Sequence, residues 1–259
     1  MLFRSNGVAT AASNRAGTSR LVNLSTRGRI AAGSPLLVGF AVSGTEPRQL
    51  LVRGVGPTLG LFGITDAVSA TEMQIIDSAG RTVVSNQGWA SAATVTAASV
   101  RTGAFPLPER SADSAAVVTL PPGTYSLLVG VGGSALGGVA LAEVYDADTT
   151  GTNSRLVNIS TRGAAAAGNG ALISGFVIAG DSAQRVLLRG AGPALAKFGL
   201  NGVNSDPVLG LYDSAGRMLG GNDNWVSDSA ALTQAAASVT TSTECPPRSL
   251  RWWRSTAQH

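Results

Sequence analysis

Hydrophobic residues occur along this chain in short runs, each bounded by Gly, Pro, Asp or Ser. Short apolar runs separated by turn residues predict the strands of a β-sandwich or barrel, not long helices. In the first half of the chain, the runs that we interpret as strands are Leu21–Leu24, Leu36–Val42, Leu50–Val52, Met73–Ile76, Thr82–Val84, Ala115–Leu120, Tyr125–Val131 and Val139–Tyr145.

The residues between these runs predict turns and few helices. Asp77–Gly80 is typical of a hairpin turn, because the Asp accepts backbone hydrogen bonds and the Gly adopts a positive φ. Pro121–Thr124 predicts a second turn, and Gly130–Gly138 a third, looser one. Only the Ala-rich segments 90–100 and 226–239 favour a helix, so we expect at most one short helix in each half of the chain.

The chain contains a long internal repeat. Residues 19–28 return as residues 154–163 with nine of ten residues identical, at an offset of 135 that becomes 136 from Gly39 onward. A repeat of this length predicts two tandem copies of one module. The further matching segments, in chain order, are Gly39-Phe40 with Gly175-Phe176, Arg53–Pro57 with Arg189–Pro193, Phe62-Gly63 with Phe198-Gly199, Asp77–Arg81 with Asp213–Arg217, and Trp89 with Trp225.

The fold class predicted from these patterns is all-β, with two tandem antiparallel β-sandwich repeats of jelly-roll or immunoglobulin-like type. Repeat 2 follows repeat 1 only to about Val239 and has no counterpart of the last three predicted strands. Because missing strands leave unpaired sheet edges, we expect repeat 2 to be loosely packed or self-associating. The predicted organisation is a linker remnant at 1–18, repeat 1 at 19–148, a linker at 149–153, incomplete repeat 2 at 154–241 and a disordered tail at 242–259.

Composition narrows the function classes. Hydrophobic residues make up 44% of the chain but aromatic residues only 5%, so the core must consist mainly of Val, Leu, Ile and Ala. The net charge of +4 comes from arginines near the two ends and leaves the repeats themselves neutral, which argues against a nucleic-acid-binding surface. No apolar run reaches the ~18 residues that a membrane-spanning helix needs.

The two ends of the chain lead to two further expectations. The first residues contain no apolar stretch typical of a signal peptide, so we expect any export signal to lie upstream of Met1. The last fifteen residues hold the only cysteine, Cys245, the only histidine, His259, and two of the four tryptophans. Such a mixture is what an out-of-frame reading of GC-rich DNA gives; a natural basic tail is the alternative.

Three segments of repeat 1 carry a resemblance to a known family. Residues 75–81, 115–130 and 137–145 together resemble the bacterial pre-peptidase C-terminal domain, in which a strand and turn precede a Pro-Gly-Thr-Tyr strand pair and a closing Gly-rich strand. The resemblance implies a β-sandwich appended to exported enzymes and surface proteins. The whole unit, residues 19–241, is also similar to repeats of large exported bacterial proteins, which implies an extracellular or cell-surface location.

Two motifs suggest catalysis or nucleotide binding at first sight. Gly54-Val-Gly56-Pro57 has the glycine spacing of a nucleotide loop, but Pro57 lacks the N–H that a phosphate needs, so a structural turn is favoured. A Ser-His-Asp site is excluded because the only histidine is the terminal residue. Asp77, Asp113 and Glu143 could form paired carboxylates if the fold brought them together.

Charged side chains at repeated positions offer further candidates. Arg27 with Arg162, and Arg53 with Arg189, could bind an anion, but we favour structural bonds to loop carbonyls or to Asp77 and Asp213.

Asp213 and Asp223 lie near asparagines at 222 and 224 that could help to hold Ca²⁺. A local turn in which the Asp side chain caps its own backbone is the favoured alternative, because repeat 1 has no acid at the place of Asp223.

The sequence therefore predicts a non-catalytic structural or adhesion repeat module of an exported or cell-surface bacterial protein. The alternative is a carbohydrate-binding accessory module of a secreted enzyme, with Trp89 and Trp225 as sugar-stacking platforms instead of core plugs. The expected partners are cell-surface polysaccharide or neighbouring repeats, with no nucleic acid and no membrane span. No catalytic, cofactor-binding or metal-ligating residue is assigned.

Overall fold

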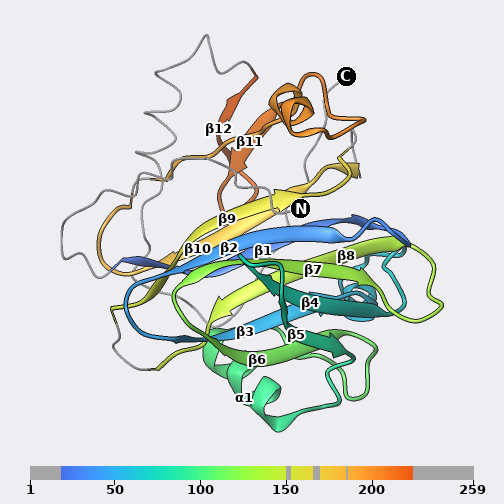
Figure 1. Cartoon of the computed structure of the whole chain (residues 1–259), viewed down its shortest axis with the longest axis vertical. Coiled ribbons are helices and arrows are strands. Elements are labelled where there is room, and N and C mark those ends of the chain that lie inside the picture. Colours follow the sequence, from blue (N-terminus) through green and yellow to red (C-terminus); the bar gives the residue numbers. More distant parts are fainter. Residues whose placement is uncertain (1–18, 150–152, 166–169, 185, 224–259) are drawn as a thin grey trace. The chain divides into compact units, whose positions relative to one another are not determined.

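The chain is all-β and its sheets are antiparallel (Figure 1). The computed structural model describes residues 19–149, 153–165, 170–184 and 186–223. It divides into two compact units, a large unit Arg20–Ile178 and a small unit made of Met1–Ser19 with Ala179–His259. In the described part of the chain, no helix has the length and apolar character needed to cross a membrane.

The large unit is built on one barrel-like sheet of ten strands in the order β5-β4-β7-β2-β9-β1-β8-β3-β6, with β10 on β1. The two ends of the sheet approach each other, since Ala115 N–H on β6 donates to Asn86 Oδ1 on β5 at 3.0 Å. The strands are β1 Arg20–Ile30, β2 Leu36–Ser43, β3 Arg48–Val55, β4 Thr71–Asp77, β5 Thr82–Gln87, β6 Ser114–Leu120, β7 Gly123–Val131, β8 Gly138–Asp146, β9 Arg155–Arg162 and β10 Ile173–Ala179.

Alternating burial explains most of these strands. In β2, Leu36, Val38, Phe40 and Val42 are buried while the residues between them are half-buried, because successive side chains point to opposite faces of a strand. The central strand β8 departs from this pattern and is buried at all positions from Gly138 to Tyr145. Both faces of β8 are therefore covered, as a central strand of a curled sheet requires.

The predicted turn at Asp77 and the first predicted helix are confirmed. Asp77 Oδ1 accepts the backbone N–H groups of Ala79 and Arg81, and Gly80 has φ 80°. The helix α1 spans Ala93–Thr102, contacts β3 and β6, and ends at Gly103 in the left-handed conformation. The other predicted helix, at 226–239, lies outside the described residues.

The small unit repeats part of this structure. Its elements are a short 3₁₀ helix η3 (Pro193–Phe198) and a two-stranded sheet of β11 (Leu209–Tyr212) and β12 (Met218–Asn222). They correspond to η1 (Pro57–Phe62), β4 and β5 of the large unit. The strand register is the same, since Leu211 pairs with Gly220 as Ile75 pairs with Val84. Local structure thus follows the repeated sequence.

The boundary between the units differs from the boundary between the repeats. The predicted linker is at 149–153, but β9 and β10, which begin repeat 2, belong to the sheet of the large unit, and the unit boundary falls at 178/179. The reason is that β1 and β2 of repeat 1 leave backbone edges that need partners, and β9 and β10 supply them. The predicted tail at 242–259 lies outside the described residues.

Candidate functional site: the seam between the repeats

The first hairpins of the two repeats interlock. We call the contact of β1 and β2 with β9 and β10 the seam. β1 and β2 are joined by a tight turn closed by Ala31 and Ser34, and then they separate to admit β9. β9 pairs with β2 from Leu37↔Arg162 to Ser43↔Arg155. β9 pairs with β1 only at Leu21↔Leu156, and β10 pairs with β1.

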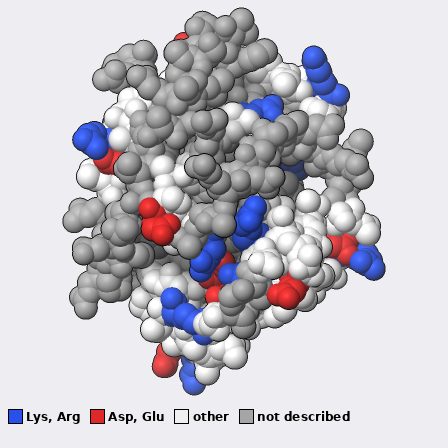
Figure 2. All heavy atoms as spheres, turned by 90° about the vertical axis from the view of Figure 1, so that its left-hand side faces the viewer, with Lys and Arg blue, Asp and Glu red and all other residues white. Residues whose placement is uncertain are grey.

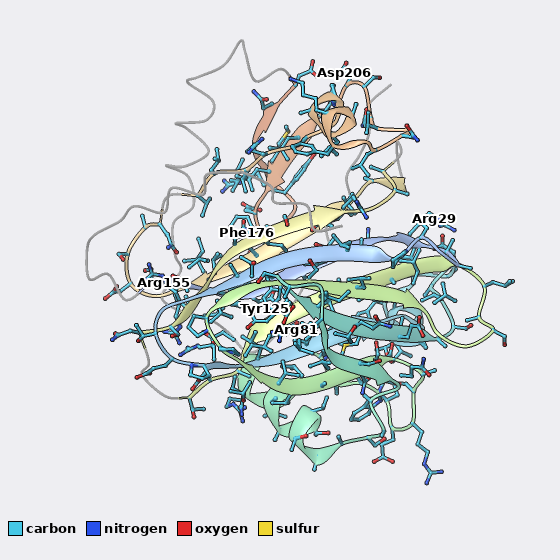
Figure 3. The ribbon with its side chains drawn as sticks, in the orientation of Figure 1. Arg29, Arg81, Tyr125, Arg155, Phe176 and Asp206 are labelled. Carbon is cyan, nitrogen blue, oxygen red and sulfur yellow. The ribbon has the colours of Figure 1, made fainter. Side chains whose placement is uncertain are left out.

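Apolar side chains of repeat 2 complete the core of repeat 1. Leu156 is 1% exposed and belongs to the main core cluster. Ile159, Leu172 and Phe176 pack against the same cluster, and Phe176 projects from β10 (Figure 3). Because full burial of one Leu side chain contributes ~1.5–3 kcal/mol, these contacts make the seam part of the core and not a loose junction.

Hydroxyl groups form a second layer of the seam. Thr26 Oγ1 lies 2.7 Å from Thr161 Oγ1, and Ser174 Oγ lies within 3.4 Å of both. At the outer end, the buried Ser154 Oγ accepts the backbone N–H of Glu46 at 3.0 Å. These bonds satisfy polar groups that the seam removes from water.

Two glycines allow the close approach of the strands. A Cβ on Gly39 would collide with Ser160 Oγ, which could rotate away. A Cβ on Gly44 would lie 2.5 Å from Ser154 Cα, and Gly44 also has φ 134°. A side chain at Gly44 would therefore meet backbone and adopt a strained conformation, so this position requires glycine.

A buried ion pair lies away from the seam, between β3 and β8. Arg53 is fully buried, and its Nε donates to Glu143 Oε2 at 2.8 Å. Its Nη1 donates to the Phe105 carbonyl at 2.6 Å, and the Phe105 ring centre lies 4.2 Å from the guanidinium carbon. Tyr145 Oη donates to Glu143 Oε1 at 2.7 Å. Both carboxylate oxygens are thus bound within the protein.

Electrostatics explains why Arg53 stays charged. Burial is the largest single influence and acts to lower the pKa of Arg53, but the charge of Glu143, its hydrogen bond, and the charges of Tyr145 and Asp113 together outweigh it, so the pKa is raised. Burial first, and then Glu143, raise the pKa of Tyr145 well above its ordinary value. The Arg is therefore a fixed cation and the Tyr a fixed hydrogen-bond donor at any ordinary pH.

The Gly-Val-Gly-Pro segment binds a carboxylate of its own chain. Gly56 N–H donates to Asp113 Oδ1 at 2.8 Å, and Thr58 Oγ1 donates to Asp113 Oδ2. Ser111 Oγ donates to the same carboxylate at 2.6 Å. The prediction of a structural turn is confirmed, and Asp113 is the group that the turn anchors.

Asp77, Asp113 and Glu143, considered above as paired carboxylates, each have hydrogen-bond partners of their own. Asp113 caps the turn at Gly56, while Glu143 lies opposite Arg53 in the β3–β8 register. Asp77 is bound by Arg81 in its own hairpin, with Nε 2.8 Å from Oδ2.

The structural role favoured for Arg53 is confirmed, because it donates to a loop carbonyl, but the suggested partner Asp77 is wrong. Arg53 instead pairs with Glu143, since the antiparallel ladder sets the two side by side. Its repeat counterpart Arg189 is exposed, and Arg27 and Arg162 lie on β1 and β9.

Trp89 is a core plug, and the stacking-platform interpretation is wrong for it. Trp89 is only 5% exposed, and its Nε1 donates to Ser111 Oγ at 3.0 Å. Sugar stacking needs an accessible ring face, which Trp89 does not offer. Trp225 lies outside the described residues.

Asp213 forms the favoured local turn. Its Oδ1 accepts the backbone N–H groups of Ala215 and Arg217 at 2.9 and 3.0 Å, and Arg217 Nε donates to Oδ2 at 3.0 Å. The bond from the Arg217 backbone is the main cause that lowers the pKa of Asp213. Asp223 is exposed, and no cluster of three or more metal-ligating acids, histidines or cysteines occurs among the residues that the structure describes.

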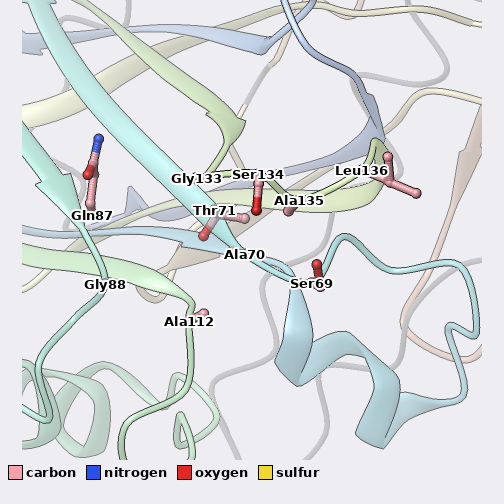
Figure 4. Close-up of a pocket in the computed structure, with 11 residues that line it drawn as sticks. Ser69, Ala70, Thr71, Gln87, Gly88, Ala112, Gly133, Ser134, Ala135 and Leu136 are labelled. Carbon is pink, nitrogen blue, oxygen red and sulfur yellow. The ribbon is translucent and has the colours of Figure 1, made fainter.

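One open pocket of about 620 Å³ lies near the start of β4 and the loop after β7 (Figure 4). Its lining consists of small or polar uncharged residues with one exposed leucine. These residues are Ser69, Ala70, Thr71, Gln87, Gly88, Ala112, Gly132, Gly133, Ser134, Ala135 and Leu136. With neither an aromatic nor a charged side chain in this lining, the pocket has hydroxyl and amide groups as its recognition chemistry.

Figure 2 shows both Lys or Arg side chains and Asp or Glu side chains among the described residues of one face. Arg29 forms an exposed ion pair with Asp66.

Sequence reasoning missed the seam, although its signal was present. The best-matched segments of the repeat, 19–28 and 154–163, are the ones that form β1 and β9. Identity between copies shows a shared role for each position, but it does not reveal that the two copies contact each other. No protein-family model matches the chain, and no curated protein is similar to it in sequence.

Proposed function

We propose that the chain is a non-catalytic structural or adhesion repeat module of an exported or cell-surface bacterial protein. The observation that supports this most is the seam, in which β9 of repeat 2 pairs with β2 of repeat 1 along their length. Repeats joined by a shared sheet transmit load between them, as a spacer between surface and tip must. The likeness to the pre-peptidase C-terminal domain supports the extracellular part of the proposal.

The chemistry of the described residues also supports a structural role. The buried Arg53 is bound by Glu143, and the buried Asp113 is bound by backbone and hydroxyl groups. A catalytic acid, base or nucleophile needs a face open to substrate, and these groups have theirs occupied.

Activity screens test the proposal. Esterase, protease and glycosidase assays of the purified chain should stay at the background of buffer alone. A rate that copurifies with the protein, and that is lost in an Asp113→Asn variant with unchanged near-UV circular dichroism, would show that the module is an enzyme.

A glycan array tests the alternative of a carbohydrate-binding module. The pocket beside Gln87 is the place where such binding would be expected, because its lining has hydroxyl and amide groups. Under the structural proposal, no glycan binds saturably. Saturable binding that is lost in Gln87→Ala, but kept in the matched surface variant Val83→Ala, would favour the alternative.

A further inference from the structure

The contacts of the seam are reciprocal between the repeats. Gly39 of repeat 1 meets Ser160 of repeat 2, and the equivalent Gly175 of repeat 2 meets Ser25 of repeat 1, where a Cβ would lie 2.8 Å from the Ser oxygen. This contact therefore occurs twice, with the roles of the repeats exchanged.

The centre of the seam shows the same relation. Thr26 contacts its own counterpart Thr161 at 2.7 Å. A Cβ on Gly28 would lie 3.0 Å from Leu172 Cδ1, and a Cβ on Gly163 would lie 3.0 Å from Leu36 Cδ1. A contact of a residue with its own equivalent is the mark of a local two-fold axis.

The outer end of each hairpin follows the same rule. In the large unit, Ser154 Oγ accepts the N–H of Glu46 at 3.0 Å. In the small unit, Ser19 Oγ accepts the N–H of the equivalent Ser182 at 2.9 Å. The glycines at 44 and 180 have φ 134° and 133°. The two ends thus share a Ser hydroxyl that accepts an equivalent backbone N–H and a glycine of the same φ.

Such a surface is complementary to itself. Seven pairs of equivalent seam residues are identical in the two repeats: Ser19 and Ser154, Ser25 and Ser160, Thr26 and Thr161, Gly28 and Gly163, Leu36 and Leu172, Gly39 and Gly175, Phe40 and Phe176. Three other seam residues differ, since Ile159, Ser174 and Ser182 correspond to Leu24, Val38 and Glu46. An isologous interface is one in which the same patch is used on both sides. Repeat 1 can therefore make these contacts with repeat 2 of its own chain or with repeat 2 of a second copy.

We propose that the partner of this seam is also a second copy of the chain, which exchanges its β9–β10 hairpin with the first copy to form a reciprocal dimer. This inference rests on the proposed structural role and names its partner. In the dimer, repeat 1 of each chain holds β9 and β10 of the other chain. The exchanged dimer makes the same contacts as the monomer, so the exchange costs little free energy at equilibrium.

Concentration decides which form is populated. The segment between β8 and β9, from Ala147 to Ser154, tethers the two halves of the seam within one chain. Linking two binding surfaces within one chain by a short segment gives an effective concentration of about millimolar, so exchange should appear when chains refold together at concentrations approaching that range. The monomer should dominate in dilute solution.

Single cysteines in separate chains test the exchange. One chain carries Thr26→Cys, a second, tagged chain carries Thr161→Cys, and both carry Cys245→Ser. The two chains are mixed in urea, refolded together and oxidised with diamide. Refolding is done at two chain concentrations, about 10 µM and about 1 mM, of which the second approaches the effective concentration set by the tether. We expect a covalent heterodimer whose yield rises at least tenfold with concentration, because only an exchanged seam joins position 26 of one chain to position 161 of another.

The matched control replaces the second chain by Val100→Cys, a side chain 79% exposed on α1. It measures chance collisions, and its heterodimer should remain rare. Light scattering of the unmodified chain after the same refolding provides a readout that needs no substitution, and the dimer fraction should rise in parallel.

A third chain with Thr26→Cys and Thr161→Cys together separates the two proposals. If it forms an internal disulfide while the mixed chains form no more heterodimer than the control, the exchange is wrong and the structural role stands. If it forms no internal disulfide at low concentration although it folds, the seam does not exist, and both the exchange and the shared-sheet argument for the structural role fall.

Discussion

At the scale of single residues, the ion pair of Arg53 and Glu143 dominates the interior. Both side chains are fully buried. Glu143 also accepts a hydrogen bond from Tyr145, and Arg53 also donates one to the Phe105 carbonyl. Two charges without water are tolerated only when each is neutralised by the other and their remaining polar atoms are bonded. This pair therefore contributes little net stability, but the loss of one partner has a large cost.

Arg53→Met should lower the free energy of unfolding by about 3–5 kcal/mol, because Glu143 would remain buried without a cation. The exposed Arg81, whose side chain is 78% accessible, provides the control, and Arg81→Met should cost at most ~1 kcal/mol. The double variant Arg53→Met/Glu143→Leu should recover most of the loss. Urea unfolding followed by Trp fluorescence measures all three, and equal effects of the two single variants would contradict the prediction.

The Asp77 hairpin should make stability depend on acid pH. Bonds from the Arg81 backbone and side chain lower the pKa of Asp77, so folding favours the carboxylate. This contribution is present above the unfolded pKa of about 4 and is lost as the pH falls through the lower folded value. Unfolding midpoints between pH 2 and 6 should decline less steeply for Asp77→Asn than for the parent chain. An unchanged slope would show that this carboxylate does not contribute.

At the scale of elements, the tightest constraint on the seam lies at the end of β2. Gly44 combines a positive φ with a close approach to the backbone of Ser154, so no other residue fits there without local rearrangement. The strand β9 depends on this approach, because its first pairs with β2 lie next to it.

Gly44→Ala should therefore loosen β9 while it leaves the remaining strands intact. We expect amide exchange at Val157–Ser160 to accelerate, corresponding to about 1–3 kcal/mol of lost local stability, while exchange at Val22–Ser25 changes little. The control is Gly60→Ala, because a Cβ on Gly60 meets nothing within 4 Å. Uniform acceleration along the chain would show that β9 is not a separate contributor.

The elements of repeat 1 could be predicted from the sequence because their signals are local. The turn at Asp77, the helix near residue 93 and the strands after residue 114 each follow from nearby residues. The partner of each strand edge could not be predicted, because the residues of β2 that pair with β9 show the same alternation whichever strand lies beside them. The Arg53–Glu143 pair was missed for the same reason, since it depends on the β3–β8 register.

At the scale of the whole molecule, we expect the sheet and not the sequence repeat to be the cooperative unit. The large unit includes the first two strands of repeat 2, and their apolar side chains belong to its core. Its unfolding should thus involve residues on both sides of the repeat boundary together.

A cut between the repeats tests this cooperativity. A protease site placed at residues 149–152 and then cleaved should leave the two fragments in one particle during gel filtration, because seven residue pairs join β2 to β9. The same chain left uncut provides the reference elution volume. Fragments that separate without denaturant would show that the covalent link, not the sheet, holds the repeats together.

The reciprocal seam also has a consequence for the origin of such a chain. When a gene segment for a self-complementary module is duplicated in tandem, both halves of a matched interface are encoded in one event, and no further substitution is needed to fit them. If the repeat arose by such a duplication, Thr26 and Thr161, which contact each other, are copies of one ancestral residue. Tandem duplication turns an association limited by dilution into one that every newly made polypeptide can complete by itself.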